Sequence, residues 1–437
     1  MNLFAIIMII LTGFISSLIC YVKTKKIFNY GSFYSYIWIV VGCLANSGFM
    51  NYYLPSTLVN MCICISMFVF GIVYAWRGQR ALSPLKGILN ADTSIRIRLI
   101  YICNIFVFMY ILPVFFKALN VIQNQGFVYL RMIAGTSSEE LGVSSFYDII
   151  LQSVCFPIIL STIFIGIVCF FLKRKNAITI LAMSLLNLVM YCLANAARNG
   201  FVIVIIFTVF AYFKLVFPLQ VNRIKREGKN HKLLLSVMIL GLLYIIIYIS
   251  KHRSSDSLTG FENVYIYFIG GPSYLTQLLK HLDNYSINHT FLYGSATFGF
   301  IYNIFAILLQ FLGVKLPISD YIINSKLTSN SYFISPSINA NAMSTIFFPF
   351  LMDWGYFGII IGSILMALIF AYIENKSNKK YDVRWIILST YSYYFLYRTI
   401  FKYDGVSISF FFLIFFIFLF TSTENNRKFK FGKHTII

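Results

Sequence analysis

Long apolar windows recur along the whole of this 437-residue chain, and they constrain its fold more than any other feature. A transmembrane helix needs about 20 mainly apolar residues. Only 11% of the residues are charged and 59% are hydrophobic, whereas soluble domains carry about 25% charged residues. The sequence therefore predicts an all-α, polytopic transmembrane protein and excludes a soluble one.

Apolar windows bounded by charged residues predict about eleven transmembrane helices. They lie near residues 2–21, 33–52, 56–76, 99–119, 148–172, 177–197, 200–217, 233–250, 354–373, 385–401 and 406–422. One further apolar segment, 297–313, contains Asn303 and Gln310. We expect it to be re-entrant or to lie in the outer interface of the membrane.

Most of the 35 lysines and arginines fall in the loops that are cytoplasmic if the N-terminus lies outside. The positive-inside rule therefore predicts an external N-terminus and a cytoplasmic C-terminus. Lys23, Lys25 and Lys26 follow the first window, as expected for a retained span rather than a cleaved signal. The net charge of +21 comes mainly from the basic residues in these loops. It therefore does not indicate nucleic-acid binding.

The windows predict three parts. Residues 1–250 form an N-terminal membrane bundle, and residues 251–353 form a large extracytoplasmic loop. Residues 354–437 form a C-terminal membrane bundle with a basic cytoplasmic tail.

A few basic residues break the positive-inside pattern because they are predicted at the outer surface. They are Arg131, Arg198, Lys251, Arg253, Arg398 and Lys402. Guanidinium groups bind phosphate through two parallel hydrogen bonds and stay charged near lipid, so a lipid-linked pyrophosphate is one ligand for them. The alternative is that these side chains only snorkel to the outer headgroups.

Polar residues recur at helical spacing in two predicted spans. In window 177–197 and just beyond it the stripe consists of Asn187, Tyr191, Asn195 and Arg198. In window 385–401 it consists of Tyr391, Tyr394 and Arg398. Offsets of 0, 4, 8 and 11 and of 0, 3 and 7 each place a stripe on one helix face. A polar face inside a membrane is expected to face protein or a wet cavity.

Asp353 stands at the predicted outer mouth of the ninth span, in NAMSTIFFPFLMDWGYFG. A carboxylate at this position has three possible roles: to activate a sugar hydroxyl, to orient an arginine, or to begin a helix. Asp404 and the pair Glu139 and Glu140 are weaker candidates of the same kind.

Motifs for nucleotide-driven or metal-dependent chemistry are absent from the sequence. It contains no P-loop, GxSxG, HExxH or DxD pattern. His252, His281 and His289 lack metal-ligand spacing, and all eight cysteines lie in apolar windows. We therefore expect neither a metal site nor a cofactor.

Short patterns and the layout together resemble the bacterial O-antigen and capsule repeat-unit polymerases, the Wzy family. The patterns are LRMIAGTSSEELG around Arg131, ANAARNGFVIVI with Arg198, KHR with Arg253, YIYFIGGPSYL, and NAMSTIFFPFLMDWGYFG with Asp353 and Gly355. The shared layout is ten to twelve spans, a large external loop in the C-terminal half and external arginines.

The resemblance implies a glycosyltransferase at the outer face of the bacterial plasma (inner) membrane. Such an enzyme moves a growing glycan from undecaprenyl pyrophosphate onto the terminal sugar of a new lipid-linked repeat unit. The layout is also similar to that of O-antigen ligases and GT-C glycosyltransferases, which work without a metal. Implied partners are the undecaprenyl-pyrophosphate-linked oligosaccharide, membrane lipid, a chain-length regulator and a flippase.

Within this reaction, Arg198 and Arg398 are candidates to stabilise the departing pyrophosphate, and Asp353 is a candidate to accept the hydroxyl proton. Candidates for substrate binding are Arg131, Arg253, Asn195, Tyr391, Tyr394 and Tyr397. An O-antigen ligase, a flippase or exporter of lipid-linked oligosaccharide, and a scaffold or receptor are the alternatives.

Overall fold

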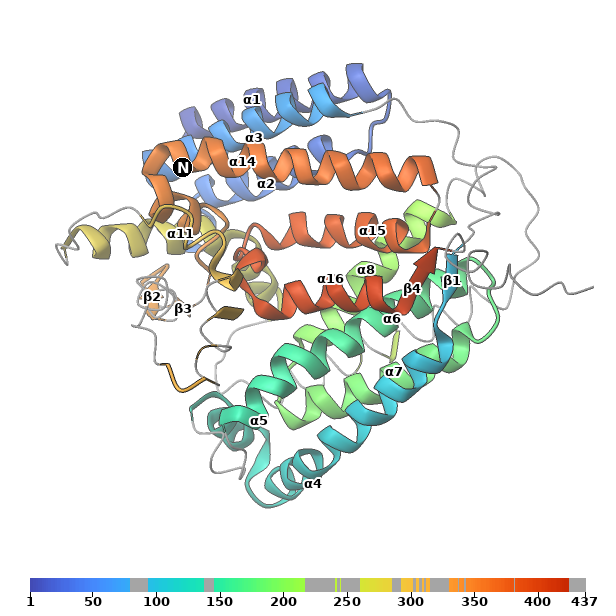
Figure 1. Cartoon of the computed structure of the whole chain (residues 1–437). Helices are drawn as coiled ribbons and strands as arrows, with labels where there is room; N and C mark the ends of the chain where they lie inside the picture. Colours follow the sequence, from blue (N-terminus) through green and yellow to red (C-terminus); the bar gives the residue numbers. More distant parts are fainter. Residues whose placement is uncertain are drawn as a thin grey trace, which may run out of the picture. The chain divides into compact units, whose positions relative to one another are not determined.

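The computed structural model describes residues 1–78, 93–136, 145–216, 240–241, 244, 260–284, 292–301, 304–305, 309, 312–314, 330–336, 338–341, 343–380 and 382–423. This part of the chain is mainly helical (Figure 1). Six of its helical segments are long and apolar enough to cross a membrane. The chain is therefore a helical membrane protein, as the sequence predicts.

The chain divides into two units, and the division differs from the predicted one. Unit 1 comprises Met1–Leu82, Leu258–Asn378 and Phe395–Ile408. Unit 2 comprises Ser83–Ser257, Lys379–Tyr394 and Ser409–Ile437. Residues 258–353, which make up most of the predicted external loop, thus belong to the same unit as the first three helices.

Unit 1 is built around four long helices that lie side by side in Figure 1: α1 (Leu3–Thr24), α2 (Tyr30–Asn46), α3 (Thr57–Arg77) and α14 (Phe347–Lys380). Small residues permit their close approach, as is common between membrane helices. Ser16 of α1 lies against Gly71 of α3 and donates a hydrogen bond to the Met67 carbonyl at 2.8 Å. The hydroxyls of Ser66 and Ser363 join α3 to α14 at 2.9 Å.

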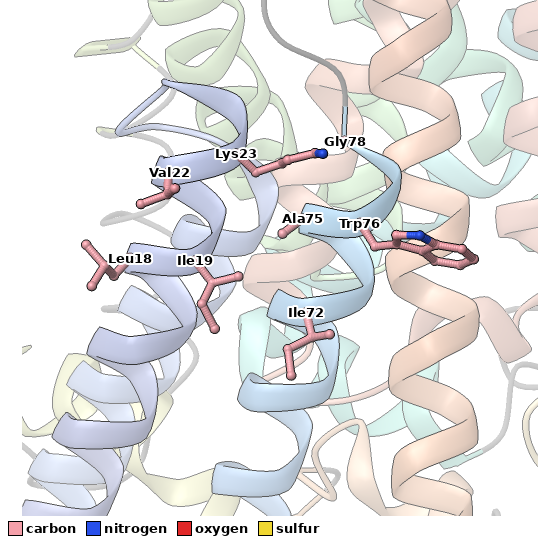
Figure 2. Close-up of a pocket in the computed structure, with 8 residues that line it drawn as sticks. All are labelled: Leu18, Ile19, Val22, Lys23, Ile72, Ala75, Trp76 and Gly78. Atoms are coloured by element: carbon pink, nitrogen blue, oxygen red, sulfur yellow. The ribbon is translucent and has the colours of Figure 1, made fainter.

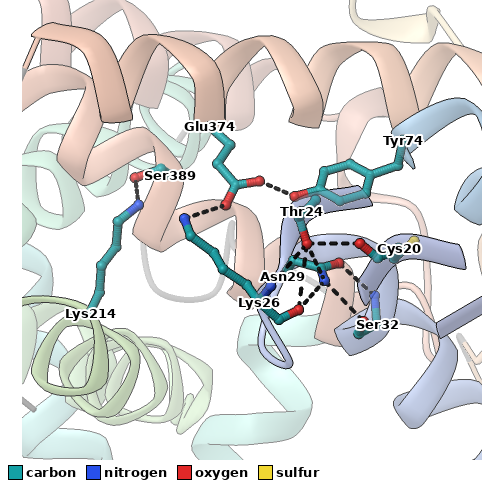
Figure 3. A network of polar contacts seen from close by, with 9 residues as sticks. All are labelled: Cys20, Thr24, Lys26, Asn29, Ser32, Tyr74, Lys214, Glu374 and Ser389. Carbon is teal, nitrogen blue, oxygen red and sulfur yellow. Dashed lines mark hydrogen bonds and ion pairs between the residues drawn. The ribbon is translucent and has the colours of Figure 1, made fainter. Parts of the chain in front are cut away.

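One end of unit 1, here called the basic end, carries Lys23, Lys26, Arg77 and Lys376. A carboxylate on α14, Glu374, is held there between two groups (Figure 3). Lys26 approaches it at 3.6 Å, and the buried Tyr74 hydroxyl donates a hydrogen bond to it. The two contacts tie α14 to α3 and to the turn that follows α1.

The opposite end of unit 1 is where α1 and α3 begin and α2 ends. A helix from the predicted external loop, α11 (Gly260–Asn284), lies there with η1 (Phe49–Asn51), β2 (Ser331–Phe333) and β3 (Asn339–Asn341) (Figure 1). The antiparallel strands pair Tyr332 with Ala340. Thr276 of α11 accepts a hydrogen bond from the Ser56 backbone at 3.0 Å, which ties α11 to the start of α3.

Unit 2 contains α4 (Ile97–Thr136), α5 (Ser145–Ile150), the π-helical turn η3 (Leu151–Cys155), α6 (Phe156–Phe171), α7 (Ala177–Ala194) and α8 (Asn199–Leu215). It also holds most of α15 (Val383–Arg398) and α16 (Ile408–Phe420), and β1 (Thr93–Ile95) paired with β4 (Thr421–Thr423). Every residue of α6 from Pro157 to Phe171 is buried. Its burial on all sides makes α6 the central helix of unit 2.

Several predicted boundaries change in the structure. The helix α4 continues to Thr136, with a break in its geometry at Gly126 (φ 83°), into the segment between the predicted spans 99–119 and 148–172. The loop 251–353 contains α11, β2 and β3. The described residues of segment 297–313 are helical at 299–301, 304–305 and 309. The predicted span 233–250 lies almost wholly outside the described residues, and Glu139, Glu140 and Arg253 lie outside them.

Candidate functional site

The clearest charged cluster of unit 1 lies where α15 ends. Arg398, the last residue of α15, donates from Nε to Asp404 Oδ2 at 3.1 Å and from Nη2 to Asp404 Oδ1 at 3.0 Å. Lys402 lies 3.8 Å from the same Oδ1 and is half exposed, whereas the side chains of Arg398 and Asp404 are each 14% exposed. We call these three residues the Arg398 cluster.

The two cations keep Asp404 ionised. Burial alone would raise the pKa of Asp404, but the charges of Arg398 and Lys402 together hold it below its ordinary value. Two cations and one carboxylate leave the Arg398 cluster with one net positive charge. A fixed guanidinium with a neighbouring ammonium is a suitable binding group for phosphate oxygens.

Three segments far apart in the sequence hold this cluster in place. The Thr345 backbone donates to the Phe401 carbonyl at 2.8 Å, and the Ile346 backbone donates to the Thr399 carbonyl at 2.9 Å. A Cβ at Gly271 of α11 would lie 2.1 Å from the Ile400 carbonyl oxygen. The patterns YIYFIGGPSYL and NAMSTIFFPFLMDWGYFG therefore meet at the loop that carries Lys402 and Asp404.

Thr345 itself has a strained backbone. It is fully buried and has a φ of 57°, a value that β-branched residues rarely adopt. Its hydroxyl accepts a hydrogen bond from the Phe347 backbone at 3.2 Å, at the start of α14. Strain of this kind persists only where the surrounding contacts enforce it, and it is often found at functional sites.

Asp353 anchors the backbone of residues 296–297. Its side chain is fully buried, and its two oxygens accept hydrogen bonds from the Ala296 and Thr297 backbones at 2.9 and 2.8 Å. The backbone leaves helical geometry at Trp354 and at Gly355 (φ 57°). Asp353 lies within α14 (Phe347–Lys380), and its two oxygens hold the backbone of residues 296–297 rather than the start of its own helix.

Tyr403 links the surroundings of the two acids. Its ring packs against Phe350 of α14 at 5.6 Å and against Phe395 of α15 at 5.8 Å. Burial, and to a lesser extent the charge of Asp353, raise the pKa of Tyr403. Its phenol therefore stays protonated at neutral pH.

The predicted stripe along 187–198 is corrected by the structure. α7 ends at Ala194, and Ala196 adopts a left-handed backbone (φ 45°), so Arg198 lies in the turn before α8 rather than on the α7 face. Asn187 donates to the Asn104 carbonyl of α4 at 3.0 Å, which is a structural bond between helices. Asn195 donates to the Tyr191 carbonyl at 2.9 Å and ends α7.

The stripe Tyr391, Tyr394 and Arg398 does lie on one helix, α15. The rings of Tyr391 and Tyr394 lie 5.5 Å apart, and both side chains are buried. Tyr391 also packs between Phe164 and Phe410. This aromatic packing favours a structural role for the two rings.

The remaining candidates are spread over the chain. Arg131 is exposed on α4, and Tyr397 packs its ring against Phe401 at 5.4 Å. Arg198 and Arg131 belong to unit 2, whereas Arg398, Asp353 and Tyr397 belong to unit 1.

The sequence did not single out Gly271 or Thr345. The only available signal was their position within the patterns YIYFIGGPSYL and NAMSTIFFPFLMDWGYFG.

A large cavity of about 970 Å³ lies between α1 and α3 at the basic end of unit 1 (Figure 2). Apolar side chains such as Leu18 and Ile72 line it, with Lys23 and Trp76 at its rim. The Arg77 guanidinium lies 4.4 Å from the centre of the Trp76 ring. This cavity lies at the other end of unit 1 from the Arg398 cluster and has no catalytic group.

A second cavity of about 360 Å³ lies at the opposite end, between α11, β2 and Tyr53. Its lining is mainly polar and aromatic.

In unit 2, Lys214 donates a hydrogen bond to Ser389 (Figure 3). Within the described ranges, no three His, Cys, Asp or Glu side chains are grouped so that they could hold a metal ion.

Comparison with known proteins adds no relative. No protein-family model, no curated protein and no solved structure matches this chain. The residues of the chain itself therefore carry the functional argument.

Proposed function

We propose that this protein is a glycosyltransferase of the Wzy type that polymerises lipid-linked oligosaccharide repeat units. It transfers the growing glycan from undecaprenyl pyrophosphate to the terminal sugar of a new lipid-linked unit. The Arg398 cluster is the observation that carries this proposal, because it presents a fixed guanidinium beside an ammonium at the end of unit 1 opposite the basic end.

The proposed reaction forms a bond between the acceptor hydroxyl oxygen and the anomeric carbon of the donor sugar. The bond from that carbon to the pyrophosphate oxygen breaks, and the hydroxyl proton passes to solvent or to an oxygen of the departing pyrophosphate. Negative charge grows on the leaving pyrophosphate, so hydrogen-bond donors fixed in advance accelerate this step. In our proposal Arg398 and Lys402 bind the pyrophosphate, and Asp404 is a positioning residue that fixes the guanidinium plane.

The remaining sequence candidates keep narrower roles in this proposal. Arg198 and Arg131 remain candidate phosphate contacts of unit 2, and in unit 1 Asp353 holds residues 296–297. The transfer needs neither a metal nor a cofactor. A flippase, a chain-length regulator and membrane lipid are the expected partners.

We further propose eleven spans, an external N-terminus, a cytoplasmic C-terminus and a site that faces outside the bacterial plasma membrane. The basic end of unit 1 supports this orientation, because α1, α3 and α14 each end there beside lysines or arginines. The Arg398 cluster then lies at the outer surface, where lipid-linked repeat units are polymerised.

Reporter fusions test this orientation. Fusions that should report cytoplasm follow Lys26, Lys175, Lys229, Lys380 and Lys433. Fusions near Glu140 and Lys326 should report the outside, because their loops lie across the membrane from the basic loops. A cytoplasmic signal at Lys326 would contradict the eleven-span topology.

Deletion of the gene in its host tests the activity. Loss of a polymerase should leave single repeat units on the carrier lipid or its acceptor, visible as one short band in gels of surface glycan. Loss of a ligase would instead leave long chains on the carrier lipid, and loss of a flippase would leave units inside the cell. An unchanged glycan ladder would contradict the proposal.

A further inference from the structure

The second cavity of unit 1 is lined by polar and aromatic side chains. It is formed by Tyr53, by Gln277, Lys280 and His281 of α11, and by residues 331–333 of β2. Its volume of about 360 Å³ falls within the range of small-molecule sites. Nothing in the proposed transfer step uses these residues.

Aromatic rings supply the apolar part of this lining. Tyr53 and Phe333 are 40% and 58% exposed. The ring of Tyr332 is held in place between His281, at 4.9 Å, and Tyr274, at 5.3 Å. Tyr274 is itself fixed by a hydrogen bond from its hydroxyl to the Asn330 carbonyl at 2.8 Å. The face of an aromatic ring carries partial negative charge, so an exposed ring can pack against the C–H groups on one face of a sugar ring.

Polar groups beside the rings supply hydrogen-bond donors and acceptors. Gln277 offers an amide that both donates and accepts, Ser331 a hydroxyl, and Lys280 an ammonium. Among the described residues, the lining contains one lysine and no carboxylate. This balance favours a ligand with hydroxyl groups and one negative charge.

The helix α11 connects this cavity to the Arg398 cluster. Gly271 lies against the Ile400 carbonyl, and Gln277 follows six positions later, about 9 Å along a helix axis. His281 lies about 15 Å along the same axis. The distance along α11 from Gly271 to these two cavity residues corresponds to a few sugar rings of one extended oligosaccharide.

We propose that this cavity binds an acidic sugar, one that carries a carboxylate or phosphate, within the oligosaccharide that reacts at the Arg398 cluster. This assignment rests on the proposed polymerase function for its biological role. The binding itself is a property of Tyr53, Gln277, Lys280 and the strand β2.

Binding of defined saccharides to the purified full-length protein in detergent micelles tests the inference. The probes are tetragalacturonate, which is acidic, maltotetraose, which is neutral, and glycerol 3-phosphate, which represents a lipid headgroup. Calorimetry and saturation-transfer NMR should show that tetragalacturonate binds more tightly than maltotetraose. Glycerol 3-phosphate should not displace it.

Two variants locate the binding. Lys280→Gln should weaken tetragalacturonate binding about tenfold and leave maltotetraose unchanged, because only the acidic sugar uses the charge. Tyr53→Ala should weaken both saccharides, because it removes a ring face while the backbone bonds of Tyr53 remain. Lys23→Gln, an exposed lysine at the basic end, is the matched control and should change neither.

Three outcomes would overturn the inference: no binding of either saccharide, equal binding by wild type and Lys280→Gln, or displacement by glycerol 3-phosphate. Each leaves the gene-deletion result unaffected. Conversely, an unchanged glycan ladder on deletion would overturn the proposed polymerase while saccharide binding at this cavity remained.

Discussion

Replacing Gly271 with alanine is expected to shorten the surface glycan to one or a few repeat units, whereas replacing Gly270 with alanine is expected to leave it near normal. The added methyl at position 271 would lie 2.1 Å from the Ile400 carbonyl oxygen and 3.0 Å from Thr345 Cγ2. The first of these is backbone, so the loop that carries Lys402 and Asp404 must move. At position 270 the nearest atom is the sulfur of Met343, at 2.8 Å, the flexible end of a side chain.

The two glycines form a matched pair because both lie inside α11. Each alanine gains about 0.5–1 kcal/mol of helix propensity, so the difference between the variants isolates the steric clash. Overpacking costs about 1–3 kcal/mol, and Gly271→Ala should unfold at a lower temperature than Gly270→Ala. Glycan ladders are compared at matched membrane levels, and thermal unfolding is measured in detergent. Equal ladders for the two variants would show that the contact with Ile400 does not support activity.

Replacing Arg398 with lysine is expected to lower the single-turnover rate of polymerisation by about 30- to 1000-fold. An ammonium keeps the charge but loses the planar fork that makes two bonds to Asp404. The loss of one fixed contact to the leaving group corresponds to about 2–4 kcal/mol of transition-state stabilisation. Asp404→Asn should reduce the rate less, because it removes a positioning group and leaves the guanidinium.

Arg384 provides the control for this substitution. It begins the same helix, α15, and pairs with Asp382 at 2.6 Å. Arg384→Lys therefore makes the same chemical change at the other end of the helix and should leave the ladder intact. If Arg398→Lys also gives a normal ladder while both proteins insert, Arg398 is a structural anchor that snorkels to the headgroups.

Much of the membrane architecture could be predicted from the sequence. Apolar windows give helix positions because hydrocarbon requires an unbroken run of apolar residues with internal backbone hydrogen bonds. The window 177–197 corresponds to Ala177–Ala194, and the window 56–76 corresponds to Thr57–Arg77. The stripe of Tyr391, Tyr394 and Arg398 was also placed correctly on one helix, because helical spacing is a local property.

The candidate site was only partly predictable. Arg398 was identified because it breaks the positive-inside pattern, which is visible in a single sequence. The sequence did not pair it with Asp404, because a carboxylate six positions away is beyond one helical turn and reaches the arginine only if the chain reverses. Arg198 was misplaced from the α7 face because the left-handed backbone at Ala196 ends the helix early, and nothing in ANAARNG requires this.

By itself, the sequence determined that this protein is helical, that it lies in a membrane and where most of its helices run. These properties follow from composition and local periodicity, since each apolar segment must meet lipid or other helices whatever its neighbours are. Only the tertiary structure decided that Gly271, Thr345 and the 398–404 segment meet. It also decided that Asp353 accepts hydrogen bonds from the backbone of residues 296–297. These contacts join segments dozens to more than a hundred residues apart, and they depend on close backbone approach, which no short-range pattern in the sequence encodes.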